Sequence, residues 1–342
     1  MQQQTLTLQD KQRNRIIPTD IYWGESQTGP LIVISHGFAA DRTFLAYLAR
    51  HLASYGFTVA ALEHPGSNMT WFNGITISGK PSDLIPASEF VNRPKDISFL
   101  LDELAKLNDL PGPMRGKFNT QQVSVIGHSL GGYTALALAG AELNLKELRE
   151  SCKKQDFLGS AGADWLQCAA AELPDDPIQL RDQRVQQAIA LNPIVGKLFG
   201  QNGLSQVKTP TLILTGTDDA ITPAINHQLQ PFTQLPTPKY LITAIGATHL
   251  SISNSAHLNQ TESSTQRTLV NERLGKETKA LHQLLQGATL AFVKQLTPEA
   301  TNYAQFLTPQ YAQSLSTSEL PLRLAKELPE SVTSWFTAVA QP

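Results

Sequence analysis

The stretch QVSVIGHSLGGYTALALAG, residues 122–140, changes character in its middle. Its first part is rich in β-branched side chains, which is typical of a buried strand, and its last part is rich in alanine and leucine, which favour a helix. Between them, residues 127–131 match the pattern G-x-S-x-G, which can place a serine on a sharp strand-to-helix turn. The stretch therefore predicts a strand–turn–helix unit that presents Ser129 as a nucleophile.

Short apolar, β-rich runs alternate with helical patterns along most of the chain. This alternation predicts an α/β fold in which a mostly parallel, doubly wound sheet carries helices on both faces. In residues 93–107 the apolar side chains recur at helical spacing, and Pro94 suits the first turn of that helix. The predicted strands are residues 31–35, 57–62, 122–127, 185–191, 211–216 and 239–245, and the other predicted helices are residues 42–55, 130–141 and 276–296.

Two segments interrupt this alternation. Residues 141–184 separate a helix from the next strand, where roughly two to six residues would suffice. Insertions at this point of an α/β sheet lie near the carboxyl ends of the strands, so we expect a cap or lid over a ligand site. Residues 298–342 are aromatic enough to pack on the core as a C-terminal extension. The predicted α/β core is residues 13–140 and 185–297, after a flexible N-terminus over residues 1–12.

The composition limits the classes of function. Of the 342 residues, 41% are hydrophobic and 16% are charged, which favours one large folded domain. The formal net charge of −2 gives no basic surface for nucleic acid. No run approaches the roughly 18 apolar residues of a transmembrane segment, and the polar start lacks the apolar core of a signal peptide. We therefore expect a soluble, cytoplasmic protein, or a periplasmic or secreted one if the N-terminus has been trimmed.

A nucleophilic serine needs a base, and the base needs an acid that orients it. In this architecture the order along the chain is serine, acid, histidine, each after a strand. Asp219 follows the predicted strand 211–216; the neighbouring Asp218 is the alternative, and both carboxylates could instead cap the next helix. His249 directly follows the last predicted strand. Ser129, Asp219 and His249 therefore form the predicted catalytic triad.

The other histidines among the eight in the chain fit the role of base less well. His36 and His128 flank glycines in turns and precede the acid, His51 and His282 lie within helices, His64 ends an early strand, His227 is too close to Asp219, and His257 follows no strand.

A second glycine-containing turn, SHGF at residues 35–38, follows the strand 31–35. We expect the backbone amides of Phe38 and Leu130 to form an oxyanion hole. His36 is expected to hold this loop by a hydrogen bond rather than to transfer protons. The supporting residues of the two turns are His36, Gly37, Gly127, His128 and Gly131.

The two cysteines, Cys152 and Cys168, both lie in the predicted cap. They form no C-x-x-C pair or His/Cys cluster, so no metal site is expected. The sequence leaves open whether they form a disulfide, which would indicate an oxidising compartment, or stay as free thiols in a small subcore.

These motifs resemble the α/β-hydrolase superfamily, and more narrowly the group that joins platelet-activating-factor acetylhydrolases with predicted dienelactone hydrolases. The resemblance covers most of residues 13–296 and implies the same triad and no cofactor. It is carried by the stretches SHGF (35–38), LASYGF (52–57), EHPGS (63–67), RPKDISFLLDEL (93–104) and GHSLGG (127–132).

The chain departs from its neighbours in this superfamily. Dienelactone hydrolases use a cysteine nucleophile, so Ser129 favours ester hydrolysis over dienelactone opening. Chlorophyllases are also similar through H-G-F and G-H-S-x-G-G, although plant members usually carry arginine where this chain has Leu130. A long apolar acyl or phytyl group would suit the aromatic residues Trp71, Phe72 and Trp165 in the predicted lid regions.

The leading hypothesis is a serine-dependent carboxylic-ester hydrolase that forms an acyl-enzyme and acts on a small-molecule or lipid-like ester. The alternatives are a thioesterase or peptidase with the same triad, and a non-catalytic ligand-binding protein on the same scaffold. Specificity is expected to lie in residues 66–92 and 141–184, and the sequence does not determine the oligomeric state.

Overall fold

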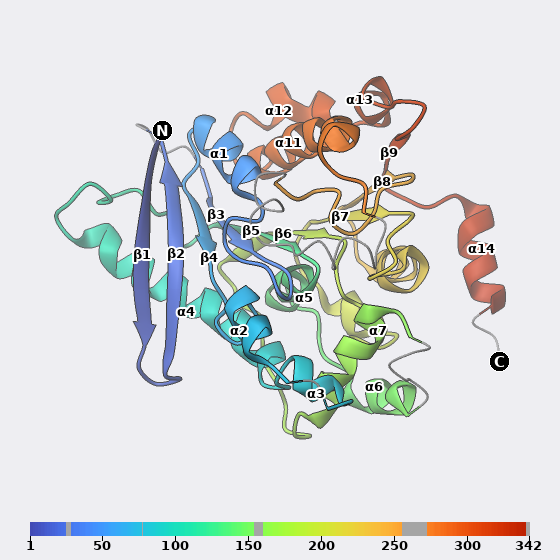
Figure 1. The fold of residues 1–342 in the computed structure, drawn as a ribbon. Helices are drawn as coiled ribbons and strands as arrows, with labels where there is room; N and C mark the ends of the chain where they lie inside the picture. Colours follow the sequence, from blue (N-terminus) through green and yellow to red (C-terminus); the bar gives the residue numbers. More distant parts are fainter. Residues whose placement is uncertain (25–28, 77, 154–159, 255–271, 340–342) are drawn as a thin grey trace.

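A nine-stranded sheet runs through the centre of the computed structural model, with the strand order β1-β2-β4-β3-β5-β6-β7-β8-β9 (Figure 1). The pairs from β4 to β8 in this order are parallel, whereas β1–β2, β2–β4 and β8–β9 are antiparallel. The structure describes residues 1–24, 29–76, 78–153, 160–254 and 272–339. The strands are β1 (Gln2–Asp10), β2 (Arg15–Trp23), β3 (Leu31–Ser35), β4 (Val59–Leu62), β5 (Val123–His128), β6 (Val185–Leu191), β7 (Thr211–Gly216), β8 (Lys239–Ala244) and β9 (Leu322–Ala325).

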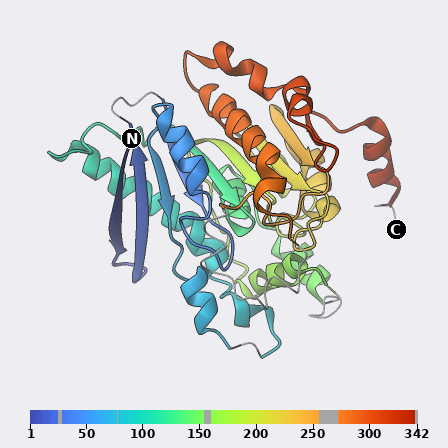
Figure 2. The same cartoon turned by 45° about the horizontal axis from the view of Figure 1, so that its top comes forward.

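Helices cover both faces of the sheet. On one face α1 and α11 lie side by side, with α12 and α13 beyond them, and α4 and α5 lie on the other (Figures 1 and 2). None of the helices in the described ranges is both long and apolar enough to cross a membrane. The helices are α1 (Ala46–Ser54), α2 (Met69–Gly74), α3 (Pro81–Leu84), α4 (Glu89–Asp109), α5 (Leu130–Leu138), α6 (Leu145–Cys152), α7 (Gly162–Leu166), α8 (Gln230–Gln234), α11 (Lys279–Lys294), α12 (Ala300–Tyr303), α13 (Pro309–Ser314) and α14 (Glu330–Val339).

The central strands are buried on both faces, as expected for a parallel sheet covered by two helical layers. In β3, Val33 packs with α4 and α5, whereas Ile32 and Ile34 pack with α1 and α11. The same alternation continues through β5, β6 and β7. Every predicted strand is present, which confirms the α/β fold class.

The helix predicted over residues 93–107 begins earlier than expected, at Glu89. Pro94 therefore lies inside α4 and not in its first turn, which corrects that prediction. Because proline has no N–H, the carbonyl of Phe90 loses its partner within the helix. The hydroxyl of Tyr133 on α5 donates to this carbonyl over 2.6 Å, so the packing of α5 on α4 replaces the missing bond.

The prediction of a flexible N-terminus over residues 1–12 is wrong. Gln2–Asp10 form β1, which pairs with β2 along its whole length. Leu6 and Leu8 pack against the core, while Thr5, Thr7 and Gln9, which alternate with them, are exposed. This alternation is that of an edge strand with one solvated face.

The C-terminal segment extends the sheet through β9, which pairs with β8. Leu320, Leu322 and Leu324 are buried on the face that carries α11. The last helix, α14, stands away from the sheet in Figure 1, and Trp335 on it is 49% exposed. The division of the chain into core, cap and extension stays a prediction.

The two segments predicted to set specificity, residues 66–92 and 141–184, contact each other in part. α3 packs against α7 and against a 3-10 helix, η1 (Gln167–Glu172), and Ser82 Oγ donates to the carboxylate of Glu172 over 2.7 Å. The amide of Ala163 donates to the carbonyl of Ile221 over 3.0 Å, so α7 also contacts the loop that follows β7. Residue 77 and residues 154–159 of these segments lie outside the described residues.

Candidate active site

Ser129 lies on a strained turn between β5 and α5. Its φ is 54° and its ψ is −117°, a conformation that residues with a side chain rarely adopt. Its amide donates to the carbonyl of Leu191 over 2.9 Å, and its carbonyl accepts from the amide of Ile194 over 3.1 Å. These bonds fix the turn to the end of β6, the neighbouring strand.

Two glycines of the G-x-S-x-G pattern are required by close backbone contacts. A Cβ atom on Gly127 would lie 1.9 Å from the carbonyl oxygen of Gly131. A Cβ atom on Gly131 would lie 2.1 Å from the carbonyl oxygen of Ser35, at the end of β3. Both distances are far inside van der Waals contact. The pattern therefore lets α5 start directly against the end of the sheet.

Asp219 and His249 form a hydrogen-bonded pair beyond the carboxyl ends of β7 and β8. Asp219 Oδ2 lies 2.7 Å from His249 Nδ1, and each residue is 4% exposed. Asp218, the alternative acid, is exposed and accepts a hydrogen bond from Thr217 Oγ1. The geometry thus favours Asp219 as the partner of the histidine and leaves His249 Nε2 as the ring nitrogen turned away from the acid.

Two residues that the sequence reasoning missed hold the Asp219 carboxylate in place. Asn192 Nδ2 donates to Oδ2 over 2.7 Å, and Thr222 donates through its amide to Oδ1 and through its hydroxyl to Oδ2, each over 2.7 Å. Asn192 has a positive φ of 44° and directly follows β6. Its position after a strand end is the signal that could have identified it.

The pKa values of this pair move in opposite directions. Burial opposes the charged form of Asp219, but the charge and hydrogen bond of His249 and the donors of Thr222 hold its pKa well below the usual range. Burial also opposes protonation of His249, but the carboxylate of Asp219 raises its pKa above the ordinary value. Glu272 adds a smaller contribution in the same direction; its carboxylate accepts from the amide of Leu250 over 2.9 Å.

His128 connects the serine turn to the histidine loop. Its Nε2 lies 3.1 Å from the carbonyl oxygen of His249, and its ring centroid lies 4.6 Å from the His249 ring. The ring of Phe44 also stacks on that of His128, with centroids 4.6 Å apart. Burial keeps the pKa of His128 well below its ordinary value, so the ring is neutral and its Nε2–H donates.

His128, the residue before Ser129, contacts His249, but in the described part of the chain no hydrogen bond joins the side chains of Ser129 and His249. In unliganded enzymes such bonds are often long and shorten only with substrate bound. His257 lies outside the described residues.

The loop after β3 passes directly beside Ser129. A Cβ atom on Gly37 would lie 3.1 Å from the Cβ of Ser129. His36 Nε2 accepts from the amide of His64 over 3.0 Å, so its Nδ1 carries the proton and donates to the carbonyl of Gly37 over 2.7 Å. This ring therefore holds the loop by hydrogen bonds. Among the described residues the amides of Phe38 and Leu130 donate no hydrogen bond, which leaves two backbone donors available beside Ser129.

Aromatic side chains line the approach from the Phe38 side. The ring of Phe38 meets that of Phe72 on α2 edge to face, with centroids 5.7 Å apart. Trp71 Nε1 donates to the carbonyl of Leu84 over 2.9 Å, which ties α2 to α3. Trp165 on α7 is buried. Phe38 and Phe72, both half-buried, thus present apolar surface at the loop after β3.

The segment predicted to form the cap is tied to the rest of the chain beside the loop that follows β7. Asp164 on α7 accepts from His227 Nε2 over 3.2 Å, and His227 Nδ1 accepts from the amide of Val195 over 3.1 Å. A disulfide joins Cys152, the last residue of α6, to Cys168 in η1.

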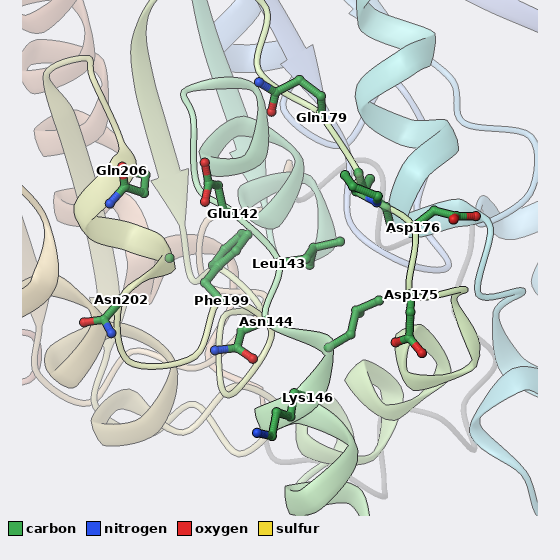
Figure 3. Close-up of a pocket in the computed structure, with 14 residues that line it drawn as sticks. Glu142, Leu143, Asn144, Lys146, Asp175, Asp176, Gln179, Phe199, Asn202 and Gln206 are labelled. Atoms are coloured by element: carbon green, nitrogen blue, oxygen red, sulfur yellow. The ribbon is translucent and has the colours of Figure 1, made fainter.

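Figure 3 shows a cavity of about 710 Å³ between residues 142–146, 175–179 and 199–206. Glu142, Asp175 and Asp176 supply its carboxylates. None of the predicted site residues lines it, so it is separate from the candidate active site. Among the residues that the structure describes, no three His, Cys, Asp or Glu side chains are grouped to hold a metal ion.

Several known proteins are similar in sequence to this chain, over stretches of different length. The family model described as platelet-activating factor acetylhydrolase, isoform II, matches residues 13–75, which hold β2, β3, β4 and the loop after β3. Cutinase 2 of Thermobifida cellulosilytica is 23% identical over 291 residues, which is 85% of this chain and 77% of the cutinase. Cutinase cut1 of Thermobifida fusca is also 23% identical over 291 residues, but the match covers 63% of that protein.

A mammalian relative is more similar over a shorter stretch. Platelet-activating factor acetylhydrolase of Canis lupus familiaris is 31% identical over 138 residues, which is 31% of each chain. This chain is an α/β-hydrolase related to platelet-activating factor acetylhydrolase. Its relatives are ester-bond hydrolases, and the chain belongs to this class of enzyme. In this hydrolase Ser129 follows β5, and the Asp219–His249 pair lies beyond the ends of β7 and β8, at the carboxyl edge of the same sheet.

Proposed function

We propose that this hydrolase cleaves carboxylic esters through an acyl-enzyme on Ser129, with His249 as base and Asp219 as the acid that orients it. The observation that carries the proposal is the strained conformation of Ser129, whose neighbour His128 contacts His249 of the Asp219–His249 pair. A strained non-glycine residue is maintained only where the surrounding structure enforces it, and such residues cluster at active sites. Here the surrounding groups are a base, its acid and two available amides.

The geometry supports the following sequence of steps. The Ser129 hydroxyl oxygen attacks the ester carbonyl carbon while its proton passes to His249 Nε2. The resulting oxyanion accepts hydrogen bonds from the amides of Phe38 and Leu130, at the N-terminus of α5 where the helix dipole also favours negative charge. Collapse breaks the ester C–O bond, and His249 returns the proton to the leaving alcohol. Water then attacks the acyl-enzyme with His249 again acting as base, and the acid is released.

The surface near the oxyanion loop favours an apolar acyl or alcohol group. Phe38 and Phe72 stand next to the predicted oxyanion hole, and α2 and α3 connect this surface to the cap. A lipid-like ester would bury apolar area against these rings, at about 25 cal/mol per Å². The similarity to chlorophyllases stays a prediction, and a phytyl ester belongs in the substrate panel for that reason.

The proposal is tested by labelling and by turnover. We expect an organophosphonate probe to add to Ser129, as read by mass spectrometry of the digested protein. Hydrolysis of p-nitrophenyl esters should fall by more than about 10⁴-fold in Ser129→Ala. Ser124→Ala, which changes a buried serine at the opposite end of β5, should retain activity. Full activity of Ser129→Ala would overturn the proposal.

Matched ester, thioester and amide substrates with one acyl group test the leaving group. We expect kcat/KM to be highest for the ester and to rise with acyl chain length. A higher kcat/KM for the thioester or amide would keep the triad but replace the proposed reaction.

A further inference from the structure

A fully buried arginine lies behind the oxyanion loop. Arg93 on α4 is 0% exposed, and burial lowers its pKa to about 9. No carboxylate in the described ranges lies within ion-pair distance of it, although Glu89 and Asp96 are near enough to favour its charged form. Burying a cation without a paired anion is unfavourable unless its donors are satisfied. The hydrogen-bond acceptors of Arg93 therefore identify the parts of the chain that this side chain keeps in place.

Two of these acceptors belong to the loop that carries Phe38 and to its support. Arg93 Nη2 donates to the carbonyl of His36, and Nη1 donates to Ser67 Oγ over 2.6 Å. The carbonyl of Ser67 in turn accepts from the amide of Ala39 over 2.9 Å. The loop is thus tied at His36 directly and at Ala39 through Ser67. The amide of Phe38 lies between these two points.

A third acceptor belongs to the helix that carries Leu130. Arg93 Nε donates to Thr134 Oγ1 over 3.2 Å. The Thr134 hydroxyl donates to the carbonyl of Leu130 over 3.0 Å, one turn back along α5. One planar guanidinium therefore bonds to groups that hold the Phe38 loop and to the Thr134 hydroxyl that bonds Leu130, so it contacts the surroundings of both predicted oxyanion-hole amides.

We propose that Arg93 is a positioning residue that sets the spacing between the amides of Phe38 and Leu130. This inference rests on the proposed function, because it assigns these amides to the oxyanion. Arg93 lies behind the donors and does not touch the substrate. A guanidinium presents its donors in a fixed planar fork, which reaches the end of β3, the loop after β4 and α5 together, whereas an ammonium is a single point.

The test compares Arg93→Lys and Arg93→Met with wild type on one p-nitrophenyl ester. Displacing a donor by about an ångström costs up to about 10²-fold in rate, because the donors act on the oxyanion and only weakly on the ground-state carbonyl. We therefore expect kcat to fall about 10-fold in Arg93→Lys and about 100-fold in Arg93→Met, with KM within about 3-fold. The rate of Ser129 phosphonylation should fall in parallel. If Arg93→Met does not fold, Arg93→Lys alone decides the outcome.

Lys239→Met is the matched control for lost stability. Lys239 is also a buried cation that donates to carbonyls, those of Phe232 and Leu235, but it lies at the start of β8, away from the site. It should lower the thermal midpoint and leave kcat unchanged.

The outcomes separate this inference from the proposed function. Labelling of wild-type Ser129 together with unchanged kcat in folded Arg93→Lys and Arg93→Met would overturn the role of Arg93 alone. An increase in KM without a loss of kcat, or an equal loss of kcat in Lys239→Met, would overturn it as well. Absence of labelling in wild type would overturn both. A selective loss of kcat and of phosphonylation would support it.

Discussion

The two sides of Ser129 are held by buried polar networks of opposite design. On the histidine side a carboxylate, Asp219, pairs with His249 and accepts further hydrogen bonds from Asn192 and Thr222. On the side of the proposed oxyanion hole a cation, Arg93, donates to neutral carbonyl and hydroxyl oxygens. The network on the histidine side places the negative charge of Asp219 next to His249, which must gain and lose a proton in the proposed reaction. The other places a charge behind two backbone amides that do not titrate.

This difference predicts how each side responds to substitution. Changes around Asp219 alter both the orientation and the pKa of His249, so they affect the rate and its pH dependence. Changes around Arg93 move hydrogen-bond donors without altering the base, so they affect the maximal rate alone. Kinetic constants measured across pH therefore distinguish the two networks.

Among substitutions in the two networks, the largest expected effect follows from Asp219→Asn. The amide keeps the shape of the side chain but removes the negative charge that orients His249 and stabilises its protonated form, so kcat should fall about 10⁴-fold. The measurement is kcat on a p-nitrophenyl ester, with circular dichroism to verify folding. Asp218→Asn is the matched control, since that carboxylate is exposed, and it should retain wild-type kcat. The reverse result would assign the acid to Asp218.

A smaller effect is expected when the oxyanion network loses one tie. In Ser67→Ala the Arg93 guanidinium loses its shortest hydroxyl acceptor, at 2.6 Å. The amide of Ala39 still donates to the backbone carbonyl of residue 67, but that residue is no longer bonded to Arg93. We expect kcat to fall about 5- to 10-fold, a fraction of the effect of losing a whole donor. Ser124→Ala removes another fully buried hydroxyl, bonded to Gln187 over 2.8 Å, and controls for stability. Equal kcat values for the two variants would contradict the assigned role of Ser67.

The pH profile sharpens the contrast. Asp219 raises the pKa of His249 above 6.5, and a protonated His249 cannot accept the serine proton. The acid limb of kcat/KM in wild type should therefore have its midpoint above pH 6.5. In Asp219→Asn the ring keeps the burial that lowers its pKa and only the weaker charge of Glu272 that raises it, so the midpoint of the residual activity should fall below that of wild type.

The oxyanion-side variants Arg93→Lys and Ser67→Ala should lower the plateau and leave this midpoint unchanged. Glu272→Gln, which removes the weaker of the two charges that raise the pKa of His249, should lower the midpoint by less than Asp219→Asn does. A midpoint that moves in Ser67→Ala would show that the two networks are coupled.

The two networks also differ in how far the sequence predicts them. Ser129, Asp219 and His249 each follow a strand, and the chain order of strands fixes which edge of a parallel sheet they share. Local patterns therefore suffice for these residues. The partners of Arg93 come from the end of β3, the loop after β4 and α5, and only tertiary packing brings these segments together. No periodicity or motif around residue 93 indicates such a set.

The errors in the fold prediction have different origins. Pro94 was expected at a helix start because proline lacks a donor, but the Tyr133 hydroxyl satisfies the carbonyl that Pro94 leaves free. The first strand was missed because its exposed face is polar, although the alternation of Leu6 and Leu8 with polar residues was readable as an edge strand. In the first case a residue distant in the sequence, Tyr133, overrides the local signal, whereas in the second the local alternation itself indicates the strand.

The smallest expected effect on catalysis comes from the cap, outside both networks. The bond between Cys152 and Cys168 closes a loop with a sequence separation of 16, for which chain entropy predicts a stabilisation of about 3 kcal/mol. The double variant Cys152→Ser/Cys168→Ser should lose up to this amount in urea unfolding. Its kcat should stay within about 3-fold, because the bonds of α7 to Ile221 and His227 do not involve the disulfide. A kcat loss as large as that of Asp219→Asn would mean that the cap, and not the polar networks, orients the acid loop.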